Sequence, residues 1–125
     1  MRYLIVDDAQ TMRRIVVSSL ASIGFKGIVE AENGQDALEK LKNNKVDFII
    51  TDWNMPVMSG LEFIKIVKAD PLYQDIPILM VTTRGNKEDI IAALRAKVDN
   101  YVVKPFSAAT LKSKIEDVIA KKKAK

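Results

Sequence analysis

The sequence contains no cysteine and no histidine among its 125 residues. Without cysteine there is no disulfide and no thiol nucleophile, and without either residue there is no zinc site of the usual Cys/His kind. The absence of histidine also removes the commonest general base. Any chemistry must therefore use carboxylate, hydroxyl, amine or guanidinium groups.

Long hydrophobic runs are also missing. No apolar run approaches the roughly 20 residues that a membrane-spanning helix needs, and the N-terminus has no signal-peptide pattern. We therefore expect a soluble, cytoplasmic protein. The length and the composition, 48% hydrophobic and 29% charged, predict one globular domain covering residues 1–125.

The excess of positive charge is confined to a basic C-terminal tail, residues 121–125. Lysine and arginine number 20 against 16 aspartate and glutamate, and this tail holds four of the lysines. The rest of the chain is neutral, and we interpret the tail as a solvated helix end, where cations complement the helix dipole. We expect no nucleic acid or membrane as a partner, and nothing in the sequence requires more than a monomer.

Short apolar runs alternate with helical patterns along the chain. The runs are typical of strands buried on both faces of a parallel sheet, and they lie at 3–6, 28–31, 48–51, 78–81 and 101–103. Apolar residues at helical spacing predict helices at 12–23, 35–41, 61–67, 87–96 and 111–119. The sequence therefore predicts an α/β fold, a doubly wound (βα)5 domain with a five-stranded parallel sheet and helices on both faces.

Polar side chains follow the predicted strands at the sheet edge where open parallel sheets bind ligands. They are Asp7, Asp8, Asp52, Thr82, Thr83 and Lys104. Each alone has an ordinary structural explanation as a helix cap, a turn residue or a solvated loop residue. Their convergence at one edge favours a site, because independent caps need not supply complementary chemistry.

The residue types at this edge indicate a chemistry. Neighbouring carboxylates at Asp7, Asp8 and Asp52 repel one another unless a pKa rises or a cation binds. An oxygen-only site that keeps several waters favours Mg²⁺, with Mn²⁺ as a substitute. Carboxylates are ionised at neutral pH, so Asp52 is available to attack phosphorus while Lys104 and Thr82 bind phosphoryl oxygens.

Four segments resemble, in order along essentially the whole chain, the motifs of the receiver domains of two-component response regulators. They are Leu4-Ile5-Val6-Asp7-Asp8, Asp52-Trp53-Asn54-Met55-Pro56 with Gly60, Val81-Thr82 and Val103-Lys104-Pro105-Phe106. Within that family the chain is most similar to single-domain chemotaxis regulators, through residues 11–15, 52–56 and 100–106. The resemblance implies a flavodoxin-like fold with strand order 2-1-3-4-5.

The resemblance implies a role for each matching position. Asp52 is the expected phosphoacceptor, and the expected Mg²⁺ ligands are Asp7, Asp8, Asp52 and the backbone carbonyl of Asn54. Thr82 matches the switch hydroxyl, Lys104 its salt-bridge partner and Tyr101 an aromatic rotamer switch. The bond between Lys104 and Pro105 is expected to be cis.

Partners also follow from the resemblance. The phosphoryl donor is expected to be a histidine kinase, a phosphatase is a further candidate partner, and the target is the flagellar motor switch, so that the chain controls rotation. The matching output face, on the fourth helix, fifth strand and fifth helix, contains Ile90, Tyr101, Val103 and Lys114. Ordinary core roles for Ile90 and Val103 remain open.

Three other functions are alternatives to a chemotaxis switch. A stand-alone receiver in a phosphorelay would share every site residue. A phosphatase acting on external substrates would need an acid or base two residues after Asp52, where Asn54 stands, and no loop has the Ser/Thr/Gly richness of a flavin phosphate cradle. We therefore expect a signalling protein that catalyses only its own phosphorylation and dephosphorylation, not an enzyme.

Three places depart from the family pattern: Ala9-Gln10, which replaces a more polar pair that contains serine, Arg84 and Lys97. Arg84 stands two residues after Thr82, where an acidic residue is common, and this neighbourhood tunes the lifetime of the phosphoryl group. Lys97 stands where glycine is often found, and it is strained if the backbone there has a positive φ.

Overall fold

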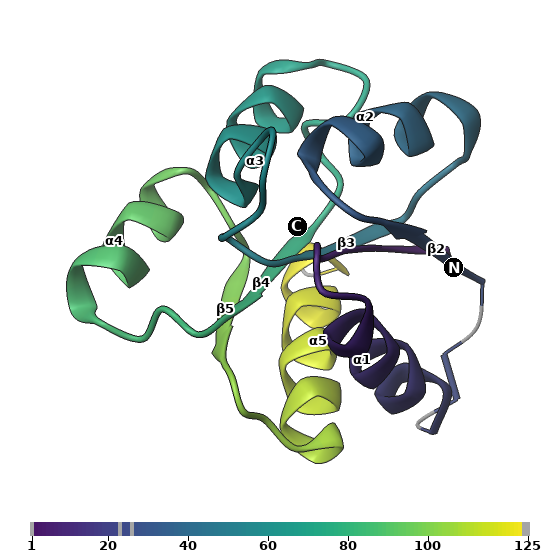
Figure 1. Ribbon diagram of the computed structural model, residues 1–125, viewed down its shortest axis with the longest axis vertical. Helices are drawn as coiled ribbons and strands as arrows, with labels where there is room; N and C mark the ends of the chain where they lie inside the picture. The colour runs from purple at the N-terminus through teal and green to yellow at the C-terminus, as the bar shows by residue number, and fades with distance from the viewer. Residues whose placement is uncertain (1, 23, 26, 124–125) are drawn as a thin grey trace.

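The structure, a computed structural model, describes residues 2–22, 24–25 and 27–123 (Figure 1). Strands and helices alternate along the chain. The strands are β1 (Tyr3–Val6), β2 (Ile28–Ala31), β3 (Phe48–Thr51), β4 (Ile78–Thr82) and β5 (Asn100–Val103). The helices are α1 (Gln10–Ser22), α2 (Gly34–Asn43), α3 (Gly60–Ala69), α4 (Lys87–Arg95) and α5 (Ala108–Lys123).

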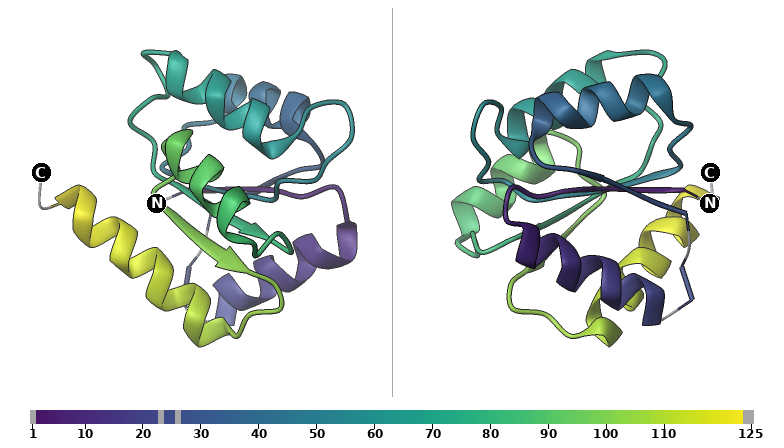
Figure 2. Two further views of the ribbon diagram at one scale, coloured as in Figure 1. Left: turned by 90° about the vertical axis from the view of Figure 1, so that its left-hand side faces the viewer. Right: turned by 45° about the vertical axis from the view of Figure 1, so that its right-hand side comes forward.

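All the strands run parallel in one sheet, in the order β2-β1-β3-β4-β5. Helices α1 and α5 cover one face of this sheet, and α2, α3 and α4 cover the other (Figure 2). The predicted α/β class, the doubly wound architecture and the strand order are confirmed.

The sheet divides the core into two clusters because successive side chains of a strand point to opposite faces. In β1, Leu4 and Val6 pack with α2 and α3, whereas Tyr3 and Ile5 pack with α1 and α5. Every residue of β1, β3 and β4 is buried, as expected of central strands covered on both faces.

Element ends differ from the predicted ranges by a few residues. Helix α1 begins at Gln10 instead of 12, and α4 ends at Arg95 with Ala96 as its C-cap. Such ends are set by capping bonds and polar residues, which the apolar spacing does not record. Residue 23, the predicted end of the first helix, lies outside the described residues.

Helix α5 extends four residues beyond its predicted end and takes in part of the basic tail. Lys121 is exposed, which agrees with a solvated helix end, and residues 124–125 lie outside the described residues. No helix in the described part of the chain combines the length and apolar character needed to cross a membrane.

Candidate functional site

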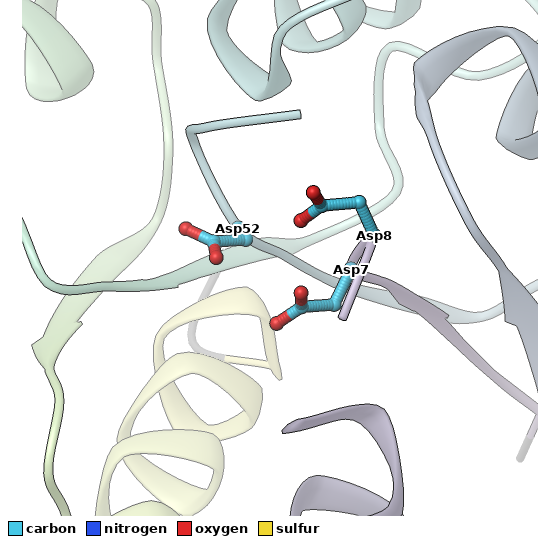
Figure 3. A group of neighbouring side chains, drawn as sticks. All are labelled: Asp7, Asp8 and Asp52. Carbon is cyan, nitrogen blue, oxygen red and sulfur yellow. The ribbon is translucent and has the colours of Figure 1, made fainter. Parts of the chain in front are cut away.

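An acidic cluster lies where β1 and β3 end side by side. These two strands pair, with Val6 opposite Thr51, and the amide of Asp52 donates to the Val6 carbonyl at 2.9 Å. The residues that follow β1 and β3 therefore lie side by side at the same edge of the sheet. One carboxylate oxygen from each of Asp7, Asp8 and Asp52 lies within 4.8 Å of the others (Figure 3).

Lys104 joins this cluster from the end of β5. Its Nζ donates to Oδ2 of Asp7 at 2.9 Å and to Oδ2 of Asp52 at 3.0 Å, and its side chain is 6% exposed. Burial alone would lower the pKa of Lys104. The hydrogen bonds and charges of Asp7 and Asp52 outweigh this effect and raise it, so the ammonium remains charged at neutral pH.

Asp7 is the buried member of the cluster. Burial raises the pKa of Asp7, and this effect exceeds the opposing hydrogen bonds from Lys104 and from the amide of Ala9 at 3.0 Å. The ionised carboxylate is therefore disfavoured in the folded chain. A divalent cation beside it would offset that cost, and the oxygen-only donor set of three carboxylates fits Mg²⁺.

The chain turns back immediately after Asp52. The amide of Trp53 donates to Oδ1 of Asp52 at 2.6 Å, and the hydroxyl of Thr51 donates to the Asp52 carbonyl at 2.9 Å. A Cβ at Gly60 would lie 1.9 Å from that carbonyl oxygen. Glycine is required at this position because helix α3 begins against the backbone of Asp52.

Arg84 is bound more extensively than the sequence suggested. Its Nε and Nη2 donate to Oδ1 of Asn54 at 2.9 and 2.8 Å, and its guanidinium lies 4.7 Å from the centre of the Trp53 ring. Nη1 also reaches Asp89 at the start of α4, at 3.4 Å. Sequence reasoning marked Arg84 only as a departure, because its contacts join segments 30 residues apart.

The predicted switch residues also converge on Arg84. Thr82 is completely buried at the end of β4, and its hydroxyl oxygen accepts from the Arg84 amide at 3.4 Å. Tyr101 is 9% exposed, and its hydroxyl donates to the Arg84 carbonyl. The loop after β4 thus contacts both residues for which the resemblance implies a switching role.

The candidate output face contains both buried and exposed positions. Val103 is 41% exposed, so the alternative of an ordinary core residue is wrong for it. Ile90 is partly buried and packs against the core cluster, while Lys114 is half-buried on α5. Tyr101 belongs to the core cluster in this structure.

One local prediction about the backbone is confirmed, and the condition stated for strain at Lys97 is met. The bond between Lys104 and Pro105 is cis, and Lys97 has a φ of 74°. The structure adds Val57, in the loop between β3 and α3, with a φ of 70° and 76% exposure. A β-branched side chain gives no sequence signal for this left-handed conformation, which it rarely adopts.

A family model, described as the response regulator receiver domain, matches residues 3–116. The chain belongs to the response regulator receiver family. This finding confirms the resemblance that the four motifs indicated.

Similar proteins cover almost the whole length of this receiver domain. It is 52% identical to a chemotaxis protein CheY homologue of Campylobacter jejuni, over 95% of this chain and 92% of that protein. It is 49% identical to chemotaxis protein CheY1 of Helicobacter pylori, over 95% and 97% of the two chains.

Solved structures agree with the fold. Chemotaxis response regulator CheY4 of Vibrio cholerae has a TM-score of 0.86 at 36% identity, with 94% of this chain and 97% of that chain covered. A putative response regulator of Chloroflexus aurantiacus has a TM-score of 0.89 at 31% identity, with 95% and 97% covered.

Proposed function

We propose that this receiver domain is a chemotaxis phosphorylation switch. It accepts a phosphoryl group on Asp52 from a histidine kinase in a Mg²⁺-dependent reaction, and the phosphorylated form binds the flagellar motor switch. The observation that carries this proposal is the position of Asp52, which is bound to the buried Lys104 ammonium and lies in one cluster with Asp7 and Asp8. The names of its relatives support the chemotaxis pathway.

The transfer is a displacement at phosphorus. A carboxylate oxygen of Asp52 forms the new P–O bond, the P–N bond to the donor imidazole breaks, and the imidazole keeps that electron pair. The side chain of Asp52 is 13% exposed, and a cleft of about 410 Å³ at its neighbours Asp8 and Trp53 offers the donor an approach. This cleft is lined by Asp8, Trp53, Asn54, Met55, Pro56, Ser59 and Arg84.

The chain supplies ligands and positive charge to this step. Asp7, Asp8, Asp52 and the backbone carbonyl of Asn54 would hold Mg²⁺, which neutralises negative charge on the attacking and transferred groups. Lys104 contributes a buried ammonium that is already within hydrogen-bond distance of Asp52. Thr82 contributes a hydroxyl at the end of the neighbouring strand.

Binding of the target follows from a shift between two conformations. Thr82 and Tyr101 both contact the loop of Arg84, so a phosphoryl group that draws the Thr82 hydroxyl inward also acts on the segment that binds Tyr101. Tyr101 already lies inward in this structure, and the phosphoryl group would stabilise this state, which offers the output face of Ile90, Tyr101, Val103 and Lys114. Its apolar centre and basic rim suit a short amphipathic peptide with acidic residues.

The first test uses Trp53, the only tryptophan, which is next to Asp52. Its fluorescence is followed during addition of Mg²⁺ and then of beryllofluoride, a phosphoryl mimic. We expect a response to each reagent, and loss of the beryllofluoride response in Asp52→Asn. The matched control is Asp75→Asn, an exposed aspartate in the loop after α3, which should behave as the unaltered chain.

Absence of any response in the unaltered chain would refute the metal and phosphoryl site. A beryllofluoride response that survives in Asp52→Asn would show that Asp52 is not the acceptor.

A stand-alone receiver in a phosphorelay is the second candidate, because it would use the same site residues. Binding of a labelled N-terminal peptide of a flagellar switch protein separates the two functions. We expect beryllofluoride to strengthen binding and Lys114→Glu to weaken it, with the exposed Lys112→Glu as the control on the same helix. Binding that beryllofluoride leaves unchanged would favour the phosphorelay.

A further inference from the structure

Arg13 lies one turn into α1 and reaches back to the loop that precedes the helix. Side chains of a helix point toward its N-terminus, so a long side chain at this position covers the segment before the first turn. Nη1 of Arg13 donates to the carbonyl oxygen of Asp7 at 2.7 Å, and the Arg13 side chain is 15% exposed. This carbonyl belongs to the peptide that joins Asp7 to Asp8.

The peptide between Asp7 and Asp8 must direct two successive side chains to the same side of the chain. Successive side chains of an extended chain point to opposite sides, yet both carboxylates must face the same place as that of Asp52. The chain accordingly leaves the strand after Val6 and bends at Asp8. A bend without a repeating hydrogen-bond pattern depends on individual bonds, and the bond from Arg13 is one of them.

Glu30 orients Arg13 from the neighbouring strand. Its Oε1 lies 3.2 Å from Nε of Arg13, and its side chain is 47% exposed. A half-exposed ion pair contributes little to stability, so its main effect here is to fix the plane of the guanidinium. In the sheet register, Glu30 of β2 lies opposite Ile5 of β1. The ion pair between Arg13 and Glu30 therefore connects α1 and β2 next to the strand that leads into the aspartates.

We propose that Arg13, oriented by Glu30, is a positioning residue for the metal site, which holds the Asp7–Asp8 peptide in the conformation that directs both carboxylates toward Asp52. The proposal rests on the function proposed above, because it concerns the same metal ligands. Arg13 acts through the backbone of Asp7.

The direction in which Mg²⁺ affinity changes when Arg13 is removed distinguishes a positioning role from a purely electrostatic one. If Arg13 acted only as a nearby cation, its removal would strengthen Mg²⁺ binding, since a repelling charge would be lost. If it holds the peptide, its removal weakens Mg²⁺ binding, because the ligands become less well ordered. Loss of an outer-shell partner typically weakens metal binding by about tenfold or more.

The experiment measures Mg²⁺ affinity from Trp53 fluorescence at constant ionic strength, together with thermal unfolding without metal. Arg13→Met removes both the bond and the charge, while Arg13→Lys keeps the charge and loses the planar fork. We expect about tenfold weaker Mg²⁺ binding in Arg13→Met and a smaller loss in Arg13→Lys and Glu30→Gln. The control is Arg14→Met, the exposed arginine next to Arg13, which should bind Mg²⁺ as the unaltered chain does.

Each other result has a definite meaning. Equal or tighter Mg²⁺ binding in Arg13→Met would overturn the positioning role, and so would a loss of thermal stability with unchanged Mg²⁺ affinity. A matching loss in Arg14→Met would show that the effect does not depend on the bond from Arg13 to the Asp7 carbonyl, and it would also overturn the proposal. If the unaltered chain does not respond to Mg²⁺, the metal site fails and the role of Arg13 fails with it.

Discussion

Two largely buried lysines make ion pairs with aspartates, and their surroundings differ. Nζ of Lys104 lies between the carboxylates of Asp7 and Asp52, at 2.9 and 3.0 Å. Nζ of Lys68 lies 3.9 Å from Asp99 and donates to the backbone carbonyls of residues 74 and 76, at 3.2 Å each.

The aspartates differ in the same way. Asp99 accepts from the amide of Ile78 at 2.7 Å, and its own amide donates to the Ile78 carbonyl at 2.8 Å, so it joins β5 to β4. Asp7 instead shares a small volume with two further carboxylates, and burial raises its pKa. The Lys68–Asp99 pair is bound to backbone groups and stabilises the fold. The Lys104–Asp7 pair is surrounded by other charged side chains, whose oxygens are available to bind a ligand.

The largest expected difference is between Lys104→Met and Lys68→Met. Without its ammonium, the Lys104 site leaves two adjacent carboxylates unpaired, and we expect the free energy of unfolding to fall by about 3 kcal/mol in metal-free buffer. The beryllofluoride response of Trp53 should also be lost. Lys68→Met should cost about 1–2 kcal/mol and retain that response.

Urea unfolding with and without Mg²⁺ measures both variants. Mg²⁺ should restore part of the stability that Lys104→Met loses. The gain in stability on adding Mg²⁺ should be the same in Lys68→Met as in the unaltered chain. Loss of the Mg²⁺ response in Lys68→Met would remove the distinction between the two pairs.

Asparagine substitutions at Asp7 and Asp99 should change the free energy of unfolding in opposite directions. Asp7→Asn removes a charge whose burial is unfavourable, so the free energy of unfolding should rise in metal-free buffer. Asp99→Asn weakens a charge-assisted bond to the amide of Ile78, and it should lower stability by about 1–2 kcal/mol. Chemical unfolding measures both; destabilisation by Asp7→Asn would show that the bond to Lys104 outweighs burial.

The two non-glycine residues that have a positive φ in the described part of the chain extend the comparison to the backbone. Val57 lies in the loop beside the site and Lys97 lies two residues before Asp99. Glycine relieves the strain at either position, and we expect Val57→Gly to gain about 1 kcal/mol and Lys97→Gly about 0.5 kcal/mol.

Mg²⁺ affinity adds a second measurement to this pair of variants. Val57→Gly should lower it, because the loop that carries Asn54 gains freedom, and Lys97→Gly should leave it unchanged. Equal Mg²⁺ affinities in both variants would show that Val57 does not affect the site.

The smallest expected effect concerns pH. The free energy of unfolding differs between the unaltered chain and Asp7→Asn, and we expect this difference to change with pH. Because the folded pKa of Asp7 is raised, the folded state binds its proton at higher pH than the unfolded chain does. The unaltered chain should therefore gain stability relative to Asp7→Asn as the pH falls through that folded pKa. The gain is complete below the unfolded pKa, roughly 3.9. Urea unfolding at a series of pH values measures this difference, and a difference that grows in the opposite direction would contradict the raised pKa.

Much of the fold could be predicted because its signals are local. The apolar run of β1 and the helical spacing in α1 record burial directly, and the alternation of the two patterns admits few topologies. The start of α1 at Gln10 and the end of α4 at Arg95 could not be placed as well, because such ends depend on capping bonds, such as the one from the Ala96 amide to the Ala92 carbonyl at the end of α4.

The candidate site divides in the same way. The three aspartates and Lys104 each follow a strand, so their convergence follows from the parallel sheet. The contacts of Arg84 and Arg13 do not, because each side chain bonds to a segment that the sequence gives no reason to select.

The sequence by itself determined the alternating elements, the edge at which the charged residues gather and the oxygen-only chemistry of that edge. These follow from side-chain period and residue type, which are properties of short segments. The tertiary structure alone decided that Lys104 lies between Asp7 and Asp52, that Arg84 binds Asn54 and that Arg13 bonds to the Asp7 carbonyl. Such contacts depend on the distance between elements after packing and on the reach of long side chains, and no local pattern encodes either.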